Sequence, residues 1–473
     1  MLFLGENRWK GFCAAADIMR RRVVLYAVAA VMVLPAGAWA AVSPGPPDES
    51  ASAYQGYHGD GGSFEPSSQC SICHETIHAQ FRESMHAKSY ENPFFRAAFF
   101  KELLPRHRED RSLTGEAAGC IACHAPVMYT QMKGKTISVK SDGPDPGGVE
   151  CDFCHRISGY KGEEPGSANY AAEPGRQKFG PFAQTSDWHH VYSELQTKSE
   201  ICGICHNRVN RHGLEIISTF TEWRESRYAK HGIQCQDCHM TVQGFLTAGK
   251  PVYESGRASQ NVLTFSPKRE RLYTHRFPGA HSESQVKGAI QLEIRVDKDV
   301  VAAGEEIEVN VIVDNSKTGH KMPTGSAEFR FLYLDFTAEI NDRVIPLSIE
   351  SFSEEMFDVS GWGRFDADIL TPDFPEGKRM YRAICVDPEG QQTLFSFDAE
   401  RIVFDNRLQA DEIRKEIFLL QVPENAGQTV ALTAKLFYKR YPDSIAARLG
   451  LDKAREVELA SATKRIAVAR AGD

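Results

Sequence analysis

The chain has 473 residues, of which 42% are hydrophobic and 25% are charged. This composition is typical of a soluble globular protein, excludes general disorder and a multi-span membrane protein, and at this length favours two or three domains. The net charge of −8 becomes −11 without residues 1–40, which hold five Lys or Arg against two Asp or Glu. Such an acidic chain argues against nucleic acid and an anionic membrane surface as partners and favours basic or cationic partners.

The first 40 residues have the features of a secretory signal peptide. Three arginines at 20–22 precede an apolar stretch at 23–34, and residues 38–40 read Ala-Trp-Ala. We expect residues 1–40, starting at Met1 or Met19, to be removed after Ala40, with export to the periplasm or the cell surface. A retained transmembrane anchor is the alternative, but Pro35 and Gly37 interrupt an apolar run that is barely long enough to cross a bilayer, so no stable membrane span is expected after cleavage.

Ten of the twelve cysteines follow one repeated spacing, Cys-x-x-Cys-His. The five copies are Cys70, Cys73 and His74; Cys120, Cys123 and His124; Cys151, Cys154 and His155; Cys202, Cys205 and His206; and Cys235, Cys238 and His239. This spacing lets two thiols reach the two vinyl groups of one porphyrin, while the following imidazole binds the iron. The copies therefore predict five covalently bound haem c groups, with the five histidines as proximal ligands.

Other chemistry also uses Cys-x-x-Cys pairs. Many cysteines in an exported chain ordinarily indicate disulfides, and such pairs also form zinc sites and redox dithiols. A closed zinc site needs two such pairs, which an odd number of motifs that each end in histidine fits poorly. The remaining cysteines are Cys13, within the signal segment, and Cys385, which we expect to be a small buried residue on a strand.

The sixth ligand of each iron decides whether a haem only carries electrons or also binds a substrate. Eleven histidines lie outside the motifs, enough for two histidines on every iron: His58, His78, His86, His107, His189, His190, His212, His231, His275, His281 and His320. Methionine ligands such as Met85, Met128 or Met322 are the second choice. Cys-x-x-Cys-Lys, which would mark a lysine-ligated catalytic haem, does not occur in the sequence.

Several runs around the motifs resemble those of known multihaem cytochromes. These runs are 81–87 (Phe-Arg-Glu-Ser-Met-His-Ala), 148–155, 222–224 leading to 232–240, 275–279 (His-Arg-Phe-Pro-Gly) and 319–325 (Gly-His-Lys-Met-Pro-Thr-Gly). In them the chain resembles c-type cytochromes related to the tetrahaem cytochrome of ammonia oxidisers and to outer-surface cytochromes of metal-reducing bacteria.

The resemblance implies distal ligands. It points to His86, His275 and His320, with His189 or His190 supplying another. The fifth motif departs from the tetrahaem pattern, so the pairing of distal histidines with haems stays open. For the other six histidines outside the motifs, a solvated loop position is the simpler expectation.

The predicted fold class is α+β with two domains. A flexible linker, rich in Pro, Gly and Ser, is expected at 41–69. A pentahaem cytochrome c domain at 70–284 follows, mostly helix and loop, with helices near 76–89 and 94–104. Residues 285–473 are predicted to form an antiparallel β-sandwich of immunoglobulin-like size.

The sandwich is predicted from apolar residues at every second position. The expected strands are 290–296, 307–313, 329–337, 344–349, 379–386, 393–397, 416–422, 429–438 and 457–468, with a short helix at 444–449. The loop 315–326 joins two of these strands and carries His320. Ligation of a haem iron by His320 would tie the sandwich to the haem domain.

Electron transfer is the leading functional hypothesis, with no catalytic residue predicted. Its partners would be other redox proteins or an extracellular electron acceptor. The second hypothesis is an oxidoreductase acting on a small nitrogen or sulfur oxyanion at one five-coordinate haem, which cyanide or nitric oxide binding would reveal. The third is a homo-oligomer or polymeric filament, in which a neighbouring subunit donates a distal histidine.

Overall fold

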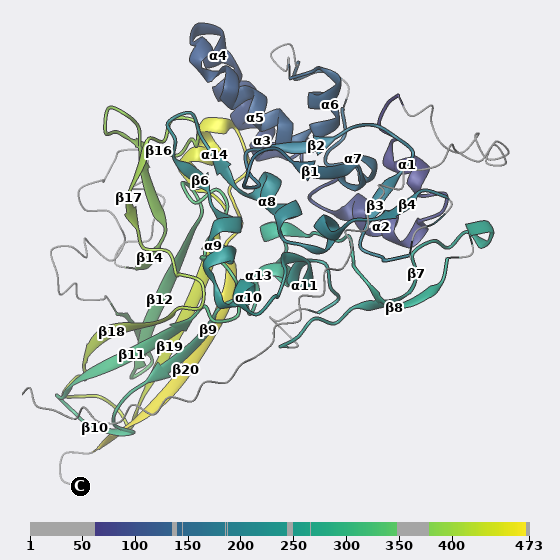
Figure 1. The fold of residues 1–473 in the computed structure, drawn as a ribbon. Coiled ribbons are helices and arrows are strands. Elements are labelled where there is room, and N and C mark those ends of the chain that lie inside the picture. Colours follow the sequence, from purple (N-terminus) through teal and green to yellow (C-terminus); the bar gives the residue numbers. More distant parts are fainter. Residues whose placement is uncertain are drawn as a thin grey trace, which may run out of the picture. The chain divides into compact units, whose positions relative to one another are not determined.

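The computed structural model describes residues 62–134, 140–143, 145–184, 186, 188–243, 249–264, 266–347 and 378–469. Residues 55–473 form one compact unit, and Figure 1 shows its elements in chain order. The predicted signal peptide with its two candidate start residues, the linker as far as residue 61 and His58 lie outside the described residues. The predicted boundary at 284/285 falls within the compact unit and stays a prediction.

The part of the chain that carries the motifs is built from short helices. Four of the five motifs end a helix at their histidine, because the five-residue motif closes about one helical turn. The helices are α1 (Ser67–Cys70), α2 (Glu75–Glu83), α3 (Pro93–Ala97), α4 (Leu104–Glu109), α5 (Thr114–His124), α6 (Pro126–Gln131), α7 (Cys151–His155), α8 (Glu200–His206), α9 (Thr219–Glu225), α10 (Arg227–Lys230), α11 (Cys235–His239) and α13 (Glu283–Val286). Short 3-10 turns are η3 (Arg111–Leu113), η5 (Glu194–Thr197), η6 (Val262–Thr264) and η7 (Gly279–His281).

The two helices predicted in this part are present with different ends. Asn92 caps α3 by accepting hydrogen bonds from two backbone N–H groups, and Pro93 fits the first helical position. A π-helical turn, η2 (Ala98–Leu103), then joins α3 to α4. By contrast, α2 ends at Glu83, because Ser84 has an extended backbone and the N–H of Met85 donates to the carbonyl of Phe277 at 3.0 Å instead of continuing the helix.

Four two-stranded sheets also lie in this part, where only helix and loop were predicted. They pair β1 (Ile157–Tyr160) with β2 (Tyr170–Ala172), β3 (Lys178–Gly180) with β4 (His190–Tyr192), β5 (Arg208–Val209) with β6 (Glu215–Ile217), and β7 (Glu254–Arg257) with β8 (Lys268–Leu272). These strands are two to five residues long, too short for a periodic apolar pattern to identify them.

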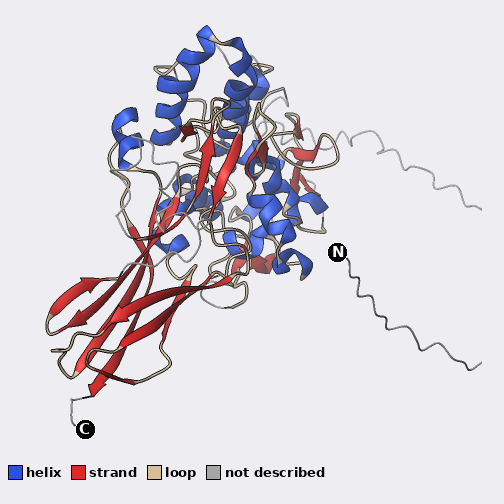
Figure 2. Ribbon diagram, turned by 90° about the vertical axis from the view of Figure 1, so that its left-hand side faces the viewer, coloured by secondary structure: helices blue, strands red, loops and turns tan. Residues whose placement is uncertain are grey.

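The longest strands of the described part of the chain come after β8, and Figure 2 shows them as the group of long red arrows at its lower left. One sheet has the order β10 (Val300–Ala302), β20 (Val457–Ala469), β19 (Thr429–Lys439), β12 (Phe331–Ile340) and β13 (Arg343–Pro346), and β14 (Arg379–Tyr381) also pairs with β12. A second has the order β18 (Ile413–Gln421), β11 (Glu306–Asp314) and β9 (Gln291–Arg295). A third has the order β16 (Gln392–Thr393), β15 (Ala383–Val386) and β17 (Arg401–Asp405), and α14 (Asp443–Leu449) precedes β20.

Alternating apolar residues of the two larger sheets share one core. Val309, Val311 and Val313 of β11 are fully buried, and the ring of Phe336 on β12 lies 4.6 Å from that of Phe418 on β18. This burial follows from the period of two along a strand, which directs every second side chain to the same face.

Three strand predictions are corrected by the structure. The strand predicted at 393–397 ends at Thr393, because the stacked rings of Phe395 and Phe397 pack with the helices near α3 and α5 instead of continuing a sheet. The strand predicted at 379–386 is divided between β14 and β15, which belong to different sheets. The all-antiparallel prediction is wrong at β10, which runs parallel to β20. The end of the strand predicted at 344–349 lies outside the described residues.

A buried carboxyl group makes the stability of this part of the chain depend on pH. Glu328 precedes β12, its side chain is 4% exposed, and burial raises its pKa to about 7. The folded state then holds a proton that the unfolded state releases above its ordinary pKa of 4.5, so the free energy of unfolding falls as pH rises from about 4.5 to 7. Urea unfolding should show that Glu328→Gln flattens this decline, while Glu339→Gln at an exposed position of β12 leaves it unchanged.

Candidate functional site

Backbone carbonyls orient the rings of three motif histidines. The Nδ1 atoms of His74, His124 and His155 donate to the carbonyls of Ala258 at 2.7 Å, Ser89 at 2.8 Å and Phe179 at 2.6 Å. Because a carbonyl oxygen can only accept, the proton of each neutral ring is on Nδ1. The lone pair of Nε2 is then free to bind a metal, as in metal sites whose histidines are held by a second hydrogen bond.

Four of the five motif histidines face a second histidine. The ring centroids are 5.9 Å apart for His74 and His189, 6.3 Å for His206 and His86, 6.2 Å for His155 and His275, and 6.3 Å for His239 and His320. The members of each pair come from segments that are far apart in the sequence. In each pair, the fold places a motif histidine opposite a histidine that the resemblance suggested as a distal ligand.

The spacing of these pairs fits one iron between two imidazoles. A metal–nitrogen bond of about 2 Å and about 1.1 Å from that nitrogen to the ring centre predict centroids about 6.2 Å apart. The four measured separations, from 5.9 to 6.3 Å, lie around this value. The residues present thus fit a six-coordinate haem iron at four positions.

The resemblance left His189 and His190 as alternatives, and the two occupy different environments. The Nε2 atom of His190 lies 2.8 Å from the carbonyl of Phe182, to which it donates. His189 instead faces His74 at the spacing of the other pairs. The geometry favours His189 as the distal residue of the first motif.

His124 is the exception among the motif histidines. Its ring stacks on Phe95, with centroids 3.9 Å apart and planes 6° from parallel. Phe95 belongs to α3 and is buried. Within the described part of the chain, no second histidine faces His124 at the spacing of the other pairs, so the residues around the second motif differ in kind from those around the other four.

A tight backbone contact holds His86 in place. A Cβ atom on Gly148 would overlap the carbonyl of His86, so only glycine allows this approach. The His86 ring also packs 4.4 Å from Phe277, which in turn lies 6.1 Å from His275. Burial lowers the pKa of His86 and His275 to about 3, and that of His124 and His239 to about 4. These imidazoles are neutral at physiological pH, which is the form that binds metals.

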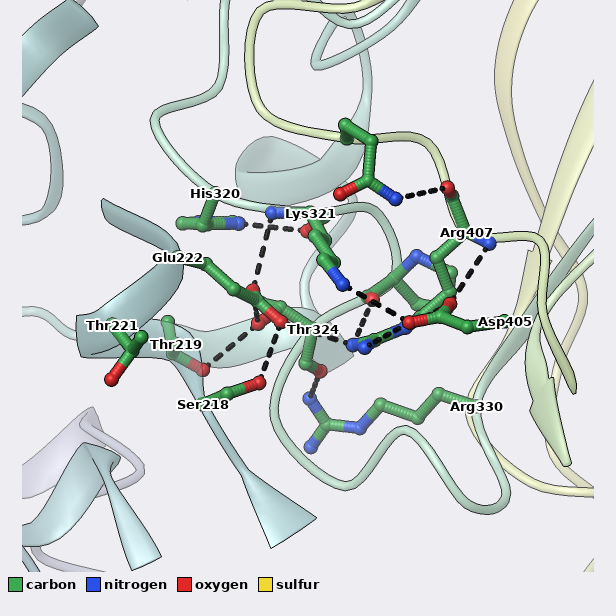
Figure 3. Close-up of polar contacts among 12 residues, drawn as sticks. Ser218, Thr219, Thr221, Glu222, His320, Lys321, Thr324, Arg330, Asp405 and Arg407 are labelled. Atoms are coloured by element: carbon green, nitrogen blue, oxygen red, sulfur yellow. Dashed lines mark hydrogen bonds and ion pairs between the residues drawn. The ribbon is translucent and has the colours of Figure 1, made fainter. Parts of the chain in front are cut away.

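The loop that carries His320 is held by a buried ionic network, shown in Figure 3. His320 donates from Nδ1 to the carbonyl of Lys321 at 2.9 Å, and the N–H of Lys321 donates to Glu222 at 3.2 Å. Glu222 also accepts from the hydroxyl of Thr324 at 2.6 Å and from the hydroxyl of Ser218 at 2.8 Å. A carboxylate on α9 therefore holds the segment that directly follows His320.

Arg407 completes this network from the β-rich part of the chain. Its guanidinium donates to Glu222 at 3.1 Å and to Asp405 at 2.8 Å, and its side chain is only 3% exposed. The sequence signals for this network were the runs that begin at Glu222 and at Gly319, and neither indicated that the two runs bond to each other or to Arg407. Arg407 lies 185 positions further along the chain, so no local pattern could have identified it.

Sulfur atoms of different motifs touch. Cys70 hydrogen-bonds to Cys151, and this bond lowers the pKa of the Cys70 thiol. Equivalent thiol–thiol bonds join Cys123 to Cys205 and Cys202 to Cys235. Each contact places two motifs side by side, and these sulfurs would hold porphyrins by thioether bonds if haem c were attached.

One expectation about the remaining histidines is wrong. His107 is fully buried, and its Nε2 atom lies 3.0 Å from the hydroxyl of Thr114, so it is not a solvated loop residue.

Among the described residues, no helix is both long and apolar enough to cross a membrane.

Replacing Glu222 tests the network around His320. In Glu222→Gln an amide nitrogen replaces one carboxylate oxygen, so two accepted hydrogen bonds and the negative charge that faces buried Arg407 are lost. We therefore expect the free energy of unfolding to fall by about 2 kcal/mol. We also expect part of one haem signal to become high-spin, because the support of the His320 loop is weakened. Urea unfolding and electron paramagnetic resonance of the haem-loaded protein check this. Glu225→Gln, exposed on the same helix, should change neither.

Comparison with known proteins agrees with this geometry. Residues 69–156 match the family described as cytochrome c554 and c-prime, and no curated protein matches the chain. The fold is similar to that of a penta-heme cytochrome c552 from Thermochromatium tepidum, with a TM-score of 0.55, 21% identity and coverage of 85% of this chain and 99% of that chain. The sporulation control protein Spo0M of Bacillus subtilis gives a TM-score of only 0.15, with 12% identity over 38% of this chain and 50% of that chain. The family match and the shared fold support a multihaem c-type cytochrome.

Proposed function

We propose that the chain is an exported electron-transfer protein that binds five haem c groups, four of them through two histidines. The observation that carries the proposal is the set of four imidazole pairs whose centroids are 5.9 to 6.3 Å apart. Haem, when bound, supplies a one-electron couple at its iron, and two imidazole ligands favour electron transfer over substrate binding. The proposed distal ligands are His189, His86, His275 and His320 for the first, fourth, third and fifth motifs.

The thiol contacts support a continuous path between sites. The first and third motifs touch through Cys70 and Cys151, and the fourth touches both the second and the fifth through its two cysteines. Cys154 lies close enough to Cys202 to influence its pKa, which brings the third site near the fourth. The proposed order is therefore first, third, fourth and fifth, with the second as a branch at the fourth.

The β-rich part has a structural role in this proposal. We assign it as an immunoglobulin-like sandwich that contributes His320 as a ligand to the fifth haem, so that one coordinate bond joins it to the haem-binding part. The buried contacts of Glu222 with Lys321, Thr324 and Arg407 support this role, because they hold the ligand loop from both parts of the chain. The proposed location is the periplasm or the outer cell surface.

A second candidate function rests on the second motif. Among the described residues no histidine ring lies opposite His124 at the spacing of the other four pairs, so the haem proposed there has no histidine assigned as its sixth ligand. An open position could take a small nitrogen or sulfur oxyanion, and the chain would then be an oxidoreductase. Cyanide binding to one high-spin haem, together with turnover of such an oxyanion, would favour this candidate over electron transfer alone. A neighbouring subunit's histidine on that iron would favour the filament instead.

The haem count and spin states test the principal proposal. We expect the mature polypeptide to carry the added mass of five haems, and its oxidised spectrum to show four low-spin haems and one high-spin haem. Mass spectrometry and electron paramagnetic resonance of the purified protein measure both. Fewer than five attached haems, or several high-spin centres, would contradict the proposal.

A matched pair of variants tests the assignment of His189. His189→Ala should convert one low-spin haem to high-spin, because His74 would lose its facing imidazole. His190→Ala should leave every spin state unchanged, because the Nε2 atom of His190 is already bonded to a carbonyl. The reverse result in the same spectra would assign His190 instead.

His320→Ala should likewise produce one high-spin haem, and an unchanged spectrum would remove the proposed link to the β-rich part.

A further inference from the structure

The middle of the first motif lies at the protein surface. Ile72, the second residue between its cysteines, is 49% exposed. The equivalent residues Ala122, Phe153 and Ile204 are at most 3% exposed, and Asp237 of the fifth motif is half-buried. Among these equivalent positions that of the first motif is the most exposed, and the histidines of the fourth and fifth motifs, His206 and His239, are exposed as well.

The turn between β7 and β8 covers this motif and presents apolar side chains to solvent. The N–H of Gln260 donates to the carbonyl of Cys73 at 2.8 Å, and the carbonyl of Ala258 accepts from His74. Val262 and Leu263 follow in the same turn and are 81% and 56% exposed. Ile72 is exposed on the motif that this turn contacts, so the three apolar side chains come from two segments held together by backbone hydrogen bonds. The β7–β8 hairpin lies below α2 in Figure 1.

Positive charge surrounds these apolar residues. Residues 249–276 contain six Lys or Arg and two Glu, in a chain whose net charge is −8. Arg257 and Lys268 are exposed and directly opposite each other in the β7–β8 register. Like charges in this arrangement destabilise a hairpin, and within the described ranges neither of these two residues forms an ion pair. Of the two glutamates, Glu254 is held by Gln80 and Arg276.

We propose that this surface, formed by Ile72, Val262, Leu263, Arg257 and Lys268, is the docking site for an acidic electron-transfer protein. The proposal rests on the proposed function and names its partner class. An apolar centre with a charged rim is the usual anatomy of a transient protein interface, and the uncompensated positive charge attracts a partner of opposite sign. The net charge of the whole chain favoured basic partners, whereas the positive charge of this surface favours an acidic partner. The local charge is the one that counts here, because it decides where two proteins meet. A protein is favoured over an anionic membrane because the surface lies over a redox site, and lipid headgroups accept no electrons.

Binding to a defined acidic redox protein tests the docking site. We would titrate the oxidised, haem-loaded protein with oxidised plant-type [2Fe–2S] ferredoxin, chosen for its acidic surface, by isothermal calorimetry at low and high ionic strength. The wild-type protein should bind, and the affinity should fall with added salt. The double variant Arg257→Glu with Lys268→Glu should weaken binding about tenfold or more at low salt. The variant Val262→Ser with Leu263→Ser should weaken binding at both salt concentrations.

Arg295→Glu with Lys415→Glu is the matched control, because both residues are exposed on β9 and β18. Three outcomes would overturn the proposal. The control pair could weaken binding as much as the Arg257 and Lys268 reversal does, that reversal could have no effect, or the wild-type protein could fail to bind. Binding to phosphatidylglycerol vesicles that the Arg257 and Lys268 reversal abolishes would assign the surface to a membrane instead. Reduction of all variants by dithionite is measured separately. Haems that dithionite cannot reduce would count against electron transfer itself, whereas normal reduction with unchanged ferredoxin affinity would count only against the docking site.

Discussion

Pairs of imidazoles held about 6 Å apart are the constraint on which the motif-bearing part of the chain depends. Each pair joins segments that are distant in the sequence, such as His74 with His189 and His155 with His275. Short helices and two-stranded sheets provide few long-range contacts of their own, so the spaces between the rings organise this part. The carbonyls that hold Nδ1 of the motif histidines determine which way each ring faces and keep the metal-binding nitrogen available.

The sequence was informative where chemistry or burial repeats over a short distance. Two thiols and an imidazole must fall within five residues to attach a porphyrin, so the motifs are visible without any structure. Likewise, β11 and β19 were found because their apolar residues alternate against a shared core. The run at 393–397 has the same alternation, yet Phe395 and Phe397 pack against helices, because periodicity does not reveal which surface an apolar residue meets.

Long-range partners could not be predicted in the same way. Neighbouring histidines such as His189 and His190 are equivalent in sequence, and only the turn of the chain decides which one faces His74. The network of Glu222 and Arg407 is a further example, since a buried ion pair is stable only if both charges and their hydrogen bonds are supplied together. Those partners come from α9, the His320 loop and the end of β17, which no local pattern connects.

The core of the two larger sheets contains no motif cysteine or histidine. Its apolar side chains pack against one another and exclude water, so the burial of this core does not depend on a porphyrin. In the motif-bearing part, by contrast, four pairs of histidines lie at the spacing that fits a bound iron. The loop that carries His320 depends on both parts of the chain, because Glu222 of α9 accepts the N–H of Lys321 and faces the guanidinium of Arg407. The apolar core can therefore keep its packing when this loop loses its support, since no member of the ionic network belongs to that core.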